Sequence, residues 1–473
     1  MTNSNNIPSF GQENTSKDSS LSSRTYDLEI VDSSKRTSSA WDSFATWVAA
    51  NANNGTWYIG GVIAACGFGG AIAHLTVSSI ISYIFLMLIG YMGYKVGSTT
   101  MGAARAAFGI RGSYVPSVVN LVQYIGWTAV NTFIAATSVS FLLSGLFGWP
   151  VYGEPGGLKG LIVGILVMSI LHIISVSTGV ESVRMIERVG IVLVAVFAIW
   201  ETVVVFQSVS FNQIIAWNPP AGQALSSGRA IDSLAAFNMG WVTCAADFTR
   251  FSKSKGGATS IPFLGALVGV FWFAFVGLTA TISIAVTSGT YDANNSDPST
   301  IASKLGLGTI ALIVVILTSM TANAVNLTAA GSSLTNIVTK LKLTPSLWIV
   351  TIGATLMTFI PVVMGSFLDS FTLFLDYIGM ALGPIIIIMI VDFYLLHHAR
   401  YDAQELIAKN GMFWYRSGIN WIAISCWASG IVTFLILQHI PFIGETIGAT
   451  FLNMAIVGCA YAFAMKISAR SNH

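Results

Sequence analysis

Charged residues are scarce in this chain, and their scarcity is the first constraint on what the protein can be. Asp, Glu, Lys and Arg make up only 9% of the 473 residues, whereas hydrophobic residues make up 54% and the mean hydropathy is +0.73. Soluble globular proteins carry about 25% charged residues. The composition therefore excludes an ordinary soluble domain and indicates a protein that exposes most of its surface to lipid.

Cysteine and catalytic motifs are also sparse. The four cysteines, Cys66, Cys244, Cys426 and Cys459, show neither CxxC nor metal-ligand spacing, so we interpret them as small apolar side chains of packed helices. The sequence contains no HExxH, Walker loop or GxSxG motif and no pair of carboxylates typical of a catalytic cleft. We therefore expect no enzymatic activity, no cofactor and no ATP-driven pump in this chain. The net charge of +2, spread over short loops, gives no reason to expect a nucleic-acid partner.

The chain has instead a series of apolar segments of about 20 residues, the length that crosses a bilayer as a helix. We predict one transmembrane domain at residues 41–467, preceded by a disordered cytoplasmic tail at residues 1–40, which are too polar to form a core. The domain is predicted to contain twelve membrane helices, at residues 44–67, 72–97, 114–147, 158–179, 186–207, 230–250, 259–288, 304–330, 346–366, 368–397, 417–438 and 446–466. The polar segment from Gly97 to Pro116 is expected to form a short interfacial helix, with Arg105 and Arg111 pairing with lipid phosphate or acidic side chains.

Lys and Arg are distributed unevenly over the loops between these segments. Of the 22 basic residues, 19 fall on the side of the two termini, Arg184 and Arg188 among them, and only Lys159, Arg229 and Lys304 fall on the other side. Cytoplasmic loops of membrane proteins carry the excess of Lys and Arg. We therefore expect both termini to be cytoplasmic in a plasma-membrane protein surrounded by lipid. The sequence does not predict an oligomeric state.

Two expected membrane helices are interrupted by Asn and Gly at matching positions. The segment Asn51-Ala-Asn53-Asn54-Gly55 lies in the first helix, and the segment Ala236-Phe-Asn238-Met-Gly240-Trp241-Val-Thr lies in the sixth. Non-helical backbone at membrane depth is tolerated where it is buried or lines a cavity. Interruptions at corresponding positions of two halves indicate the substrate and ion site of a transporter. We predict such a site here, and kinks in packed helices are the alternative.

Polar and aromatic residues of the third expected helix could complete this site. Gln123, Trp127 and Asn131 are spaced four residues apart and therefore share one helix face. Trp127 and Trp241 could hold a planar heterocycle between two rings, because bases stack on aromatic side chains. The Asn131 amide could pair with the edge of that heterocycle. For Gln123, a hydrogen bond between helices is the alternative.

The eighth expected helix contains a dense polar run from Thr318 to Thr328. The hydroxyls of Thr318 and Thr321, with carbonyls of the first break, could bind a sodium ion, and hydroxyls that bond to their own helix are the alternative. Asn326 could reach the substrate only if this helix is tilted. Glu201 could carry a proton, unless it is paired or lies at the membrane interface.

The sequence resembles the nucleobase–cation symporter-1 family, and its purine–cytosine permease branch in particular, over nearly the whole chain after residue 40. Each matching segment is short, but together they occur in the right order. The segments are Ala50-Asn51 to Gly60, RAAFGIRG after the second helix, Gly126-Trp127 to Asn131, Gly240-Trp241 with Ala245-Ala246-Asp247-Phe-Thr-Arg250-Phe, Ala322-Asn323-Ala-Val-Asn326, and Leu382-Gly383-Pro384 followed by Asp392-Phe-Tyr394.

The resemblance implies an all-α, LeuT-like fold of two inverted five-helix repeats, at about 41–210 and 228–398, with two further helices at about 417–467. It implies a symporter that imports a nucleobase such as cytosine or a purine with Na⁺ or H⁺. Allantoin, hydantoin or a thiamine-precursor pyrimidine are alternative substrates of the same fold, and a channel or a transporter-like sensor is the alternative of another class.

The resemblance also implies which residues form the site. The family's substrate residues carry over to Trp127, Asn131, Trp241 and Asn326, and its sodium ligands carry over to Asn51, Asn54, Leu317, Met320 and Thr321. Two positions depart from the family pattern. Met320 replaces a hydroxyl expected in sodium-coupled members, for which Thr318 could substitute, and Gly55 stands where related permeases often carry Ser near the base.

Overall fold

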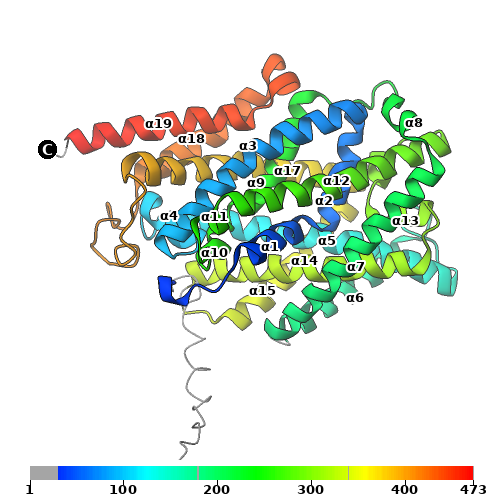
Figure 1. Cartoon of the computed structure of the whole chain (residues 1–473), viewed down its shortest axis with the longest axis horizontal. Helices are drawn as coiled ribbons and strands as arrows, with labels where there is room; N and C mark the ends of the chain where they lie inside the picture. Colours follow the sequence, from blue (N-terminus) through cyan, green and yellow to red (C-terminus); the bar gives the residue numbers. More distant parts are fainter. Residues whose placement is uncertain (1–29, 178–179, 339, 472–473) are drawn as a thin grey trace, which may run out of the picture.

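The computed structural model describes residues 30–177, 180–338 and 340–471, which fold into a bundle of helices (Figure 1). Within these ranges there is no β-sheet, and the only bridges are the isolated pairs Ser38 with Ser252 and Arg416 with Ile419. A helix satisfies its own backbone hydrogen bonds, which lipid cannot do, so the architecture fits the apolar composition. The prediction of an all-α membrane protein is confirmed.

The helices follow the expected membrane segments to within a few residues. The first half contains α1 (Ala40–Asn51), α2 (Asn54–Ile63), α3 (Gly67–Val96), α4 (Thr100–Phe108), α5 (Tyr114–Phe147), α6 (Leu158–Ser177), α7 (Val180–Ser208) and α8 (Phe211–Ala216). The second half contains α9 (Ser227–Val242), α10 (Ala245–Thr249), α11 (Lys255–Ala258), α12 (Ser260–Ser288), α13 (Pro298–Lys304), α14 (Gly308–Ile337), α15 (Leu343–Met357), α16 (Ile360–Met364) and α17 (Phe367–Val391). The last two long helices are α18 (Trp421–Gln438) and α19 (Thr450–Ser471).

The described helices are consistent with twelve membrane crossings. Nine segments of the described chain are long and apolar enough to cross a membrane, and one of them, Asn54–Val96, contains both α2 and α3. These two helices are separate crossings, because Gly67 at their junction has a φ of +68°, which ends the first one. The remaining expected crossings are α7, which is apolar over Val192–Ser208 where its side chains are described, and the pair α9 and α10.

Two crossings are each built from two helices, and we name them the first broken helix (α1 and α2) and the second broken helix (α9 and α10). The first break lies at residues 52–53, within the segment expected from the sequence. The second break lies at residues 243–244, because α9 runs without interruption through Gly240 to Val242. The expectation of an interruption at Asn238 and Gly240 is therefore corrected by one helical turn toward the C-terminus.

The last ten residues of the tail that was expected to be disordered, 30–39, belong to the described structure. Residues 1–29 and the side chains of residues 180–191, which include Arg184 and Arg188, lie outside the described part. Residues 30–39, however, pack onto the bundle: the Val31 amide donates to the Gly97 carbonyl at 2.9 Å, and the Arg36 guanidinium lies 4.4 Å from the Tyr94 ring centroid. The tail was misjudged because backbone hydrogen bonds and one cation–π contact hold this polar segment, rather than an apolar face.

The helix expected between residues 97 and 116 forms as α4, and it is buried against the rest of the protein. All nine of its residues are buried. Arg105 donates from Nη2 to Oδ1 of Asn336 in α14 at 2.5 Å, so it ties two parts of the protein together rather than meeting lipid phosphate. In Figure 1, α4 lies with α10 and α11 at one end of the bundle, and α8 and α13 lie at the other end.

The core of the bundle depends on close helix contacts. The helix α5 packs along α14, and α12 packs along both halves of the first broken helix. The approach of α2 to α12 requires glycine, since a Cβ at Gly277 would lie 2.0 Å from the Trp57 carbonyl oxygen. Small residues at such contacts allow backbones to approach closely, which is how membrane helices gain packing energy.

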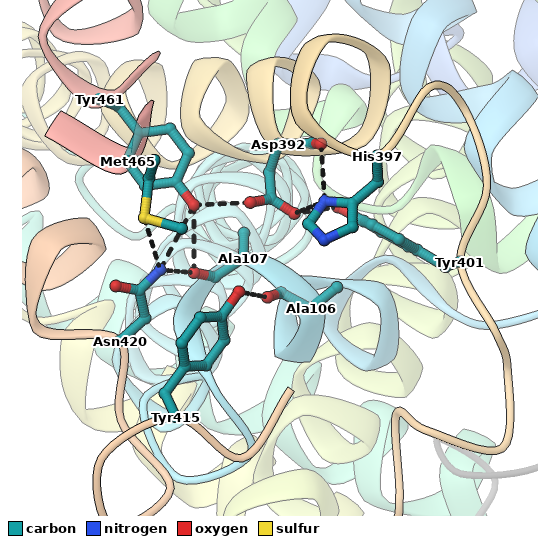
Figure 2. Close-up of polar contacts among 9 residues, drawn as sticks. All are labelled: Ala106, Ala107, Asp392, His397, Tyr401, Tyr415, Asn420, Tyr461 and Met465. Atoms are coloured by element: carbon teal, nitrogen blue, oxygen red, sulfur yellow. Dashed lines mark hydrogen bonds and ion pairs between the residues drawn. The ribbon is translucent and has the colours of Figure 1, made fainter. Parts of the chain in front are cut away.

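A polar cluster lies at the C-terminal end of α17, and we name it the Asp392 cluster (Figure 2). The helix ends in a π-helical turn, Asp392–Leu396. The Asp392 carboxylate accepts hydrogen bonds from the Tyr461 and Tyr401 hydroxyls, both at 2.6 Å, and lies 3.2 Å from Nδ1 of His397. The described partners of this carboxylate are therefore two tyrosines and a histidine.

Candidate functional site

A small cavity lies where the two broken helices meet α5 and α14. It is lined by Asn53, Tyr124, Trp127, Asn131, Phe237, Gly240, Trp241, Ala322 and Asn326. Five of the predicted substrate residues are thus brought together from three separate helices: Trp127, Asn131, Gly240, Trp241 and Asn326. Its volume is about 20 Å³, which is room for about one water molecule. A planar heterocycle enters this conformation only if lining side chains move.

The first break is stabilised by asparagine side chains that replace lost backbone hydrogen bonds. The Asn53 carboxamide caps α2, because its Oδ1 accepts from the Thr56 amide at 3.0 Å while its Nδ2 donates to the Ala50 carbonyl at 2.7 Å. Asn51 donates to the Trp47 carbonyl and accepts from the Tyr83 hydroxyl. Asn at a helix start is favoured for this reason. These bonds explain why an Asn-rich sequence breaks a helix here.

The second break is held open by the third membrane helix. The Gly240 carbonyl accepts hydrogen bonds from the Tyr124 hydroxyl at 3.2 Å, the Gln123 amide at 3.3 Å and the Thr243 hydroxyl at 2.9 Å. The Cys244 amide bonds to Trp241 three residues back, instead of to Gly240. Donors from α5 thus replace the helical hydrogen bond of Gly240, so Gln123 ties two helices together beside the site.

Trp127 spans the gap between the two broken helices. A Cβ at Gly240 would lie 3.0 Å from the indole Nε1, so glycine is needed for this approach, and a Cβ at Gly55 would lie 3.4 Å from the opposite side of the ring, at Cζ3. The indole is in edge contact with Phe237 and Phe374, each with a centroid separation of 5.2 Å. Aromatic side chains therefore surround Trp127 in this conformation, and Trp241 lines the same cavity.

The two predicted amides use their nitrogens in hydrogen bonds within the protein. Asn131 donates from Nδ2 to the Trp127 carbonyl of its own helix at 3.1 Å, and its buried Oδ1 has no hydrogen-bond partner within the described residues. Asn326 donates from Nδ2 to Oδ1 of Asn323 at 3.4 Å. Its presence on the cavity wall fits the tilted eighth helix that the prediction required.

One hydrogen bond connects the first break to α14, the helix that contains the other predicted ion ligands. Asn54, the first residue of α2, donates from Nδ2 to the Val315 carbonyl at 3.2 Å and so holds the break against α14. The hydroxyls of Thr318 and Thr321 donate to carbonyls of their own helix, at Val314 and Thr318. A hydroxyl that donates its proton keeps lone pairs that a hard cation accepts. Asn51, Leu317 and Met320 are in the adjoining turns of α1 and α14.

Glu201 is buried in the described structure, whereas its alternative interpretations were a paired residue or a residue at the membrane interface. The residue is only 1% exposed, and neither carboxylate oxygen has a hydrogen-bond partner in the described part of the chain. An isolated buried carboxylate is costly to ionise. Its position therefore fits a carboxyl group that carries a proton. By contrast Asp376, an acidic residue of α17, accepts a hydrogen bond from Gln438 at 3.4 Å.

Sequence reasoning missed four residues that line the cavity and a hydrogen-bond network next to it. Tyr124, Phe237, Asn53 and Ala322 line the cavity, and Tyr124 and Phe237 are neighbours in sequence of residues that were singled out. His172 of α6 and Asn323 of α14 form a buried hydrogen-bond network with Thr132 of α5. A lone histidine in the middle of an apolar helix was the signal that could have found this network.

Comparisons with known proteins agree with this geometry. A family model described as "Permease for cytosine/purines, uracil, thiamine, allantoin" matches residues 30–460. A Bacillus subtilis (strain 168) protein named a purine-cytosine permease is 25% identical over 433 residues, which cover 89% of this chain and 88% of the relative. The allantoin permease of the same organism is 24% identical over 445 residues, which cover 88% of this chain and 87% of the relative.

The fold is also similar to a solved transporter. A nucleobase-cation-symport-1 family transporter, solved in a closed conformation with bromovinylhydantoin bound, superposes with a TM-score of 0.75 at 17% sequence identity. The match covers 94% of this chain and 96% of that one. The resemblance noted in the sequence is confirmed, and so is the LeuT-like fold class.

Proposed function

Because the chain belongs to the family of permeases for cytosine/purines, uracil, thiamine and allantoin, we propose that it is a symporter that imports a nucleobase with a cation. The observation that carries this proposal is the cavity that Trp127, Trp241, Asn131 and Asn326 line between the two broken helices. Indole rings match the faces of a planar heterocycle, and carboxamides match its polar edge.

Several features support the remaining parts of the proposal. The 19-to-3 distribution of basic residues supports cytoplasmic termini in the plasma membrane. The relatives named above are a purine-cytosine and an allantoin permease, and both classes of substrate are nitrogen heterocycles with hydrogen-bonding groups at their edges. Cytosine and purines are our first candidates, since two tryptophans suit a flat aromatic base, and allantoin or hydantoin is the second candidate.

Uptake by the purified protein in proteoliposomes tests the substrate. Labelled cytosine should accumulate under an inward cation gradient, and unlabelled cytosine, adenine, hypoxanthine, uracil and allantoin should compete in an order that reveals the substrate class. Empty liposomes and a gradient-free sample are the controls. Absence of uptake or competition for every compound in this panel would contradict the proposal.

The coupling ion is tested in the same liposomes. The hydroxyls of Thr318 and Thr321 in α14 support sodium, whereas Glu201, which is buried and has no hydrogen-bond partner among the described residues, supports a proton. Uptake should be compared between a sodium gradient at equal pH and a pH gradient in sodium-free buffer, in wild type, Thr321→Ala and Glu201→Gln. A sodium-driven signal that is lost only in Thr321→Ala establishes sodium coupling, and a pH-driven signal that is lost only in Glu201→Gln establishes proton coupling.

A further inference from the structure

A buried histidine lies behind the cavity wall. His172 of α6 is 2% exposed. Its Nε2 lies 3.1 Å from Nδ2 of Asn323 and 3.1 Å from the Thr132 hydroxyl. The network therefore connects α6, a helix outside the cavity lining, to α5 and α14, which both contribute to it. A buried polar network of this kind fixes side-chain orientation when its members are satisfied.

The chemistry of the groups determines the direction of each hydrogen bond. The Nδ2 atom of Asn323 can only donate, so Nε2 of His172 accepts with its lone pair and the ring is neutral, with its proton on Nδ1. The same Asn323 amide group lies 3.1 Å from the Thr128 carbonyl, which also only accepts. The Thr132 hydroxyl also lies 3.1 Å from this group. The Thr128 carbonyl and Nε2 of His172, which can only accept here, hold the NH₂ end of Asn323, so its Oδ1 lies on the other side of the amide.

The orientation of Asn323 determines which atom of Asn326 faces the cavity. Oδ1 of Asn323 accepts from Nδ2 of Asn326, which leaves the amide oxygen of Asn326 for the cavity that this residue lines. The oxygen of Asn131 is available for a separate reason. Its Nδ2 donates to the Trp127 carbonyl, and its buried Oδ1 has no partner in the described chain. Two amide oxygens, from two helices, are therefore available to a ligand.

We propose that His172 is a positioning residue that, through Asn323, presents the Asn326 oxygen to the substrate, so that this oxygen and that of Asn131 together receive an exocyclic amino group. An –NH₂ group has two hydrogens, which match two acceptors. The proposal rests on the function proposed above and narrows it to planar heterocycles that bear an amino group, such as aminopyrimidines and aminopurines. A carbonyl at the same position would face two oxygens without a hydrogen between them.

Pairs of ligands that differ only in the amino group test this proposal. Competition constants should be measured for cytosine against pyrimidin-2-one and for adenine against purine, in wild type, His172→Leu and His172→Gln. Wild type should prefer the amino member of each pair by at least about tenfold, the value of one or two hydrogen bonds. The preference should fall to about threefold or less in His172→Leu. It should persist in His172→Gln, because the glutamine carbonyl oxygen can accept from Asn323.

The controls separate positioning from structural support. Equal weakening of both members of a pair in His172→Leu, with an unchanged ratio, would mean that His172 only stabilises the fold and would overturn the proposal. If His172→Leu does not reach the membrane, Asn323→Ala decides, since it breaks the link from the other side, and a wild-type ratio in that variant also overturns the proposal. If wild type takes up none of the four ligands, the function proposed above fails, which is a different result from a changed ratio.

Discussion

Buried polar atoms have hydrogen-bond partners in the Asp392 cluster, whereas some of those at the cavity between the broken helices have none among the described residues. In the Asp392 cluster, the carboxylate accepts from two tyrosine hydroxyls and faces His397, so its lone pairs are used within the protein (Figure 2). In and beside the cavity, Oδ1 of Asn131 and Oε1 of Gln123 are buried and have no partner in the described residues. An unpaired buried group costs about 1–3 kcal/mol. We infer that the cavity retains unpaired polar atoms because a ligand supplies their hydrogen-bond partners, whereas the paired atoms of the Asp392 cluster stabilise the fold.

The largest expected effect is on binding, at the cavity amides. Asn131→Ala and Asn326→Ala should reduce substrate affinity far more than stability, because a buried polar edge of the substrate is left unpaired, and such mismatches discriminate by up to about 10⁴-fold. The side-chain hydrogen bonds of Asn131 and Asn326 in the protein are few, so the melting temperature should change little. Competition constants and thermal unfolding of the same samples measure both. Unchanged affinity and substrate order in both variants would show that the amides only connect helices.

The opposite pattern is expected in the Asp392 cluster. Asp392→Ala removes the acceptor of two tyrosine hydroxyls and the partner of His397. Removing one member of a buried polar or charged pair lowers the free energy of unfolding by about 3–5 kcal/mol. The melting temperature should fall strongly, whereas the KM of the protein that remains folded should be unchanged. Tyr461→Phe is the matched control, because it removes one hydroxyl with its contacts to Asp392, Ala107 and Asn420 but keeps the carboxylate, and it should cost less, about 1 kcal/mol. A changed KM at wild-type stability would assign Asp392 to transport rather than to stability.

Substitution of Trp241 should affect only substrate affinity, whereas substitution of Trp127 should affect both affinity and stability. Trp241→Ala should weaken affinity roughly 5- to 150-fold, the equivalent of about 1–3 kcal/mol of stacking, without loss of stability, since Trp241 is only partly buried and lines the cavity. Trp127→Ala should cause a similar loss of affinity and also lower the melting temperature, because the Trp127 ring packs against Phe237 and Phe374. Normal affinity in both variants would remove stacking from the proposed mode of binding.

The membrane helices and part of the cavity lining could be predicted from the sequence, because both follow from the length and spacing of residues along a helix. The apolar lengths predicted the membrane helices, and the spacing of Trp127 and Asn131 placed both on the face that lines the cavity. The exact second break was not accessible, since α9 tolerates Gly240 and ends only where Gln123 and Tyr124 of another helix bond to the Gly240 carbonyl. Burial of α4 and of His172 likewise depends on tertiary contacts that local sequence does not encode.

The smallest expected effect is a pH dependence of the Asp392 cluster. Burial lowers the pKa of His397, but its hydrogen bond and charge interaction with Asp392 raise it, and the net pKa lies above the ordinary value of 6.5. The native state therefore favours the protonated ring, and this stabilisation is complete below pH 6.5 and is lost as the pH rises through the native pKa.

Thermal unfolding of wild type and His397→Gln between pH 5.5 and pH 9 measures this contribution, since subtraction of the variant removes the titration of all other groups. Wild type should be more stable than the variant at the acidic end by about 1 kcal/mol or less, because the His397 side chain is partly exposed and such pairs are screened. The difference should shrink as the pH rises, and affinity for substrate should be equal in the two proteins at every pH. A difference that grows toward alkaline pH would mean that the neutral ring is the form bound in the cluster. A difference in affinity would break the separation between the cluster that stabilises the protein and the cavity that binds its substrate.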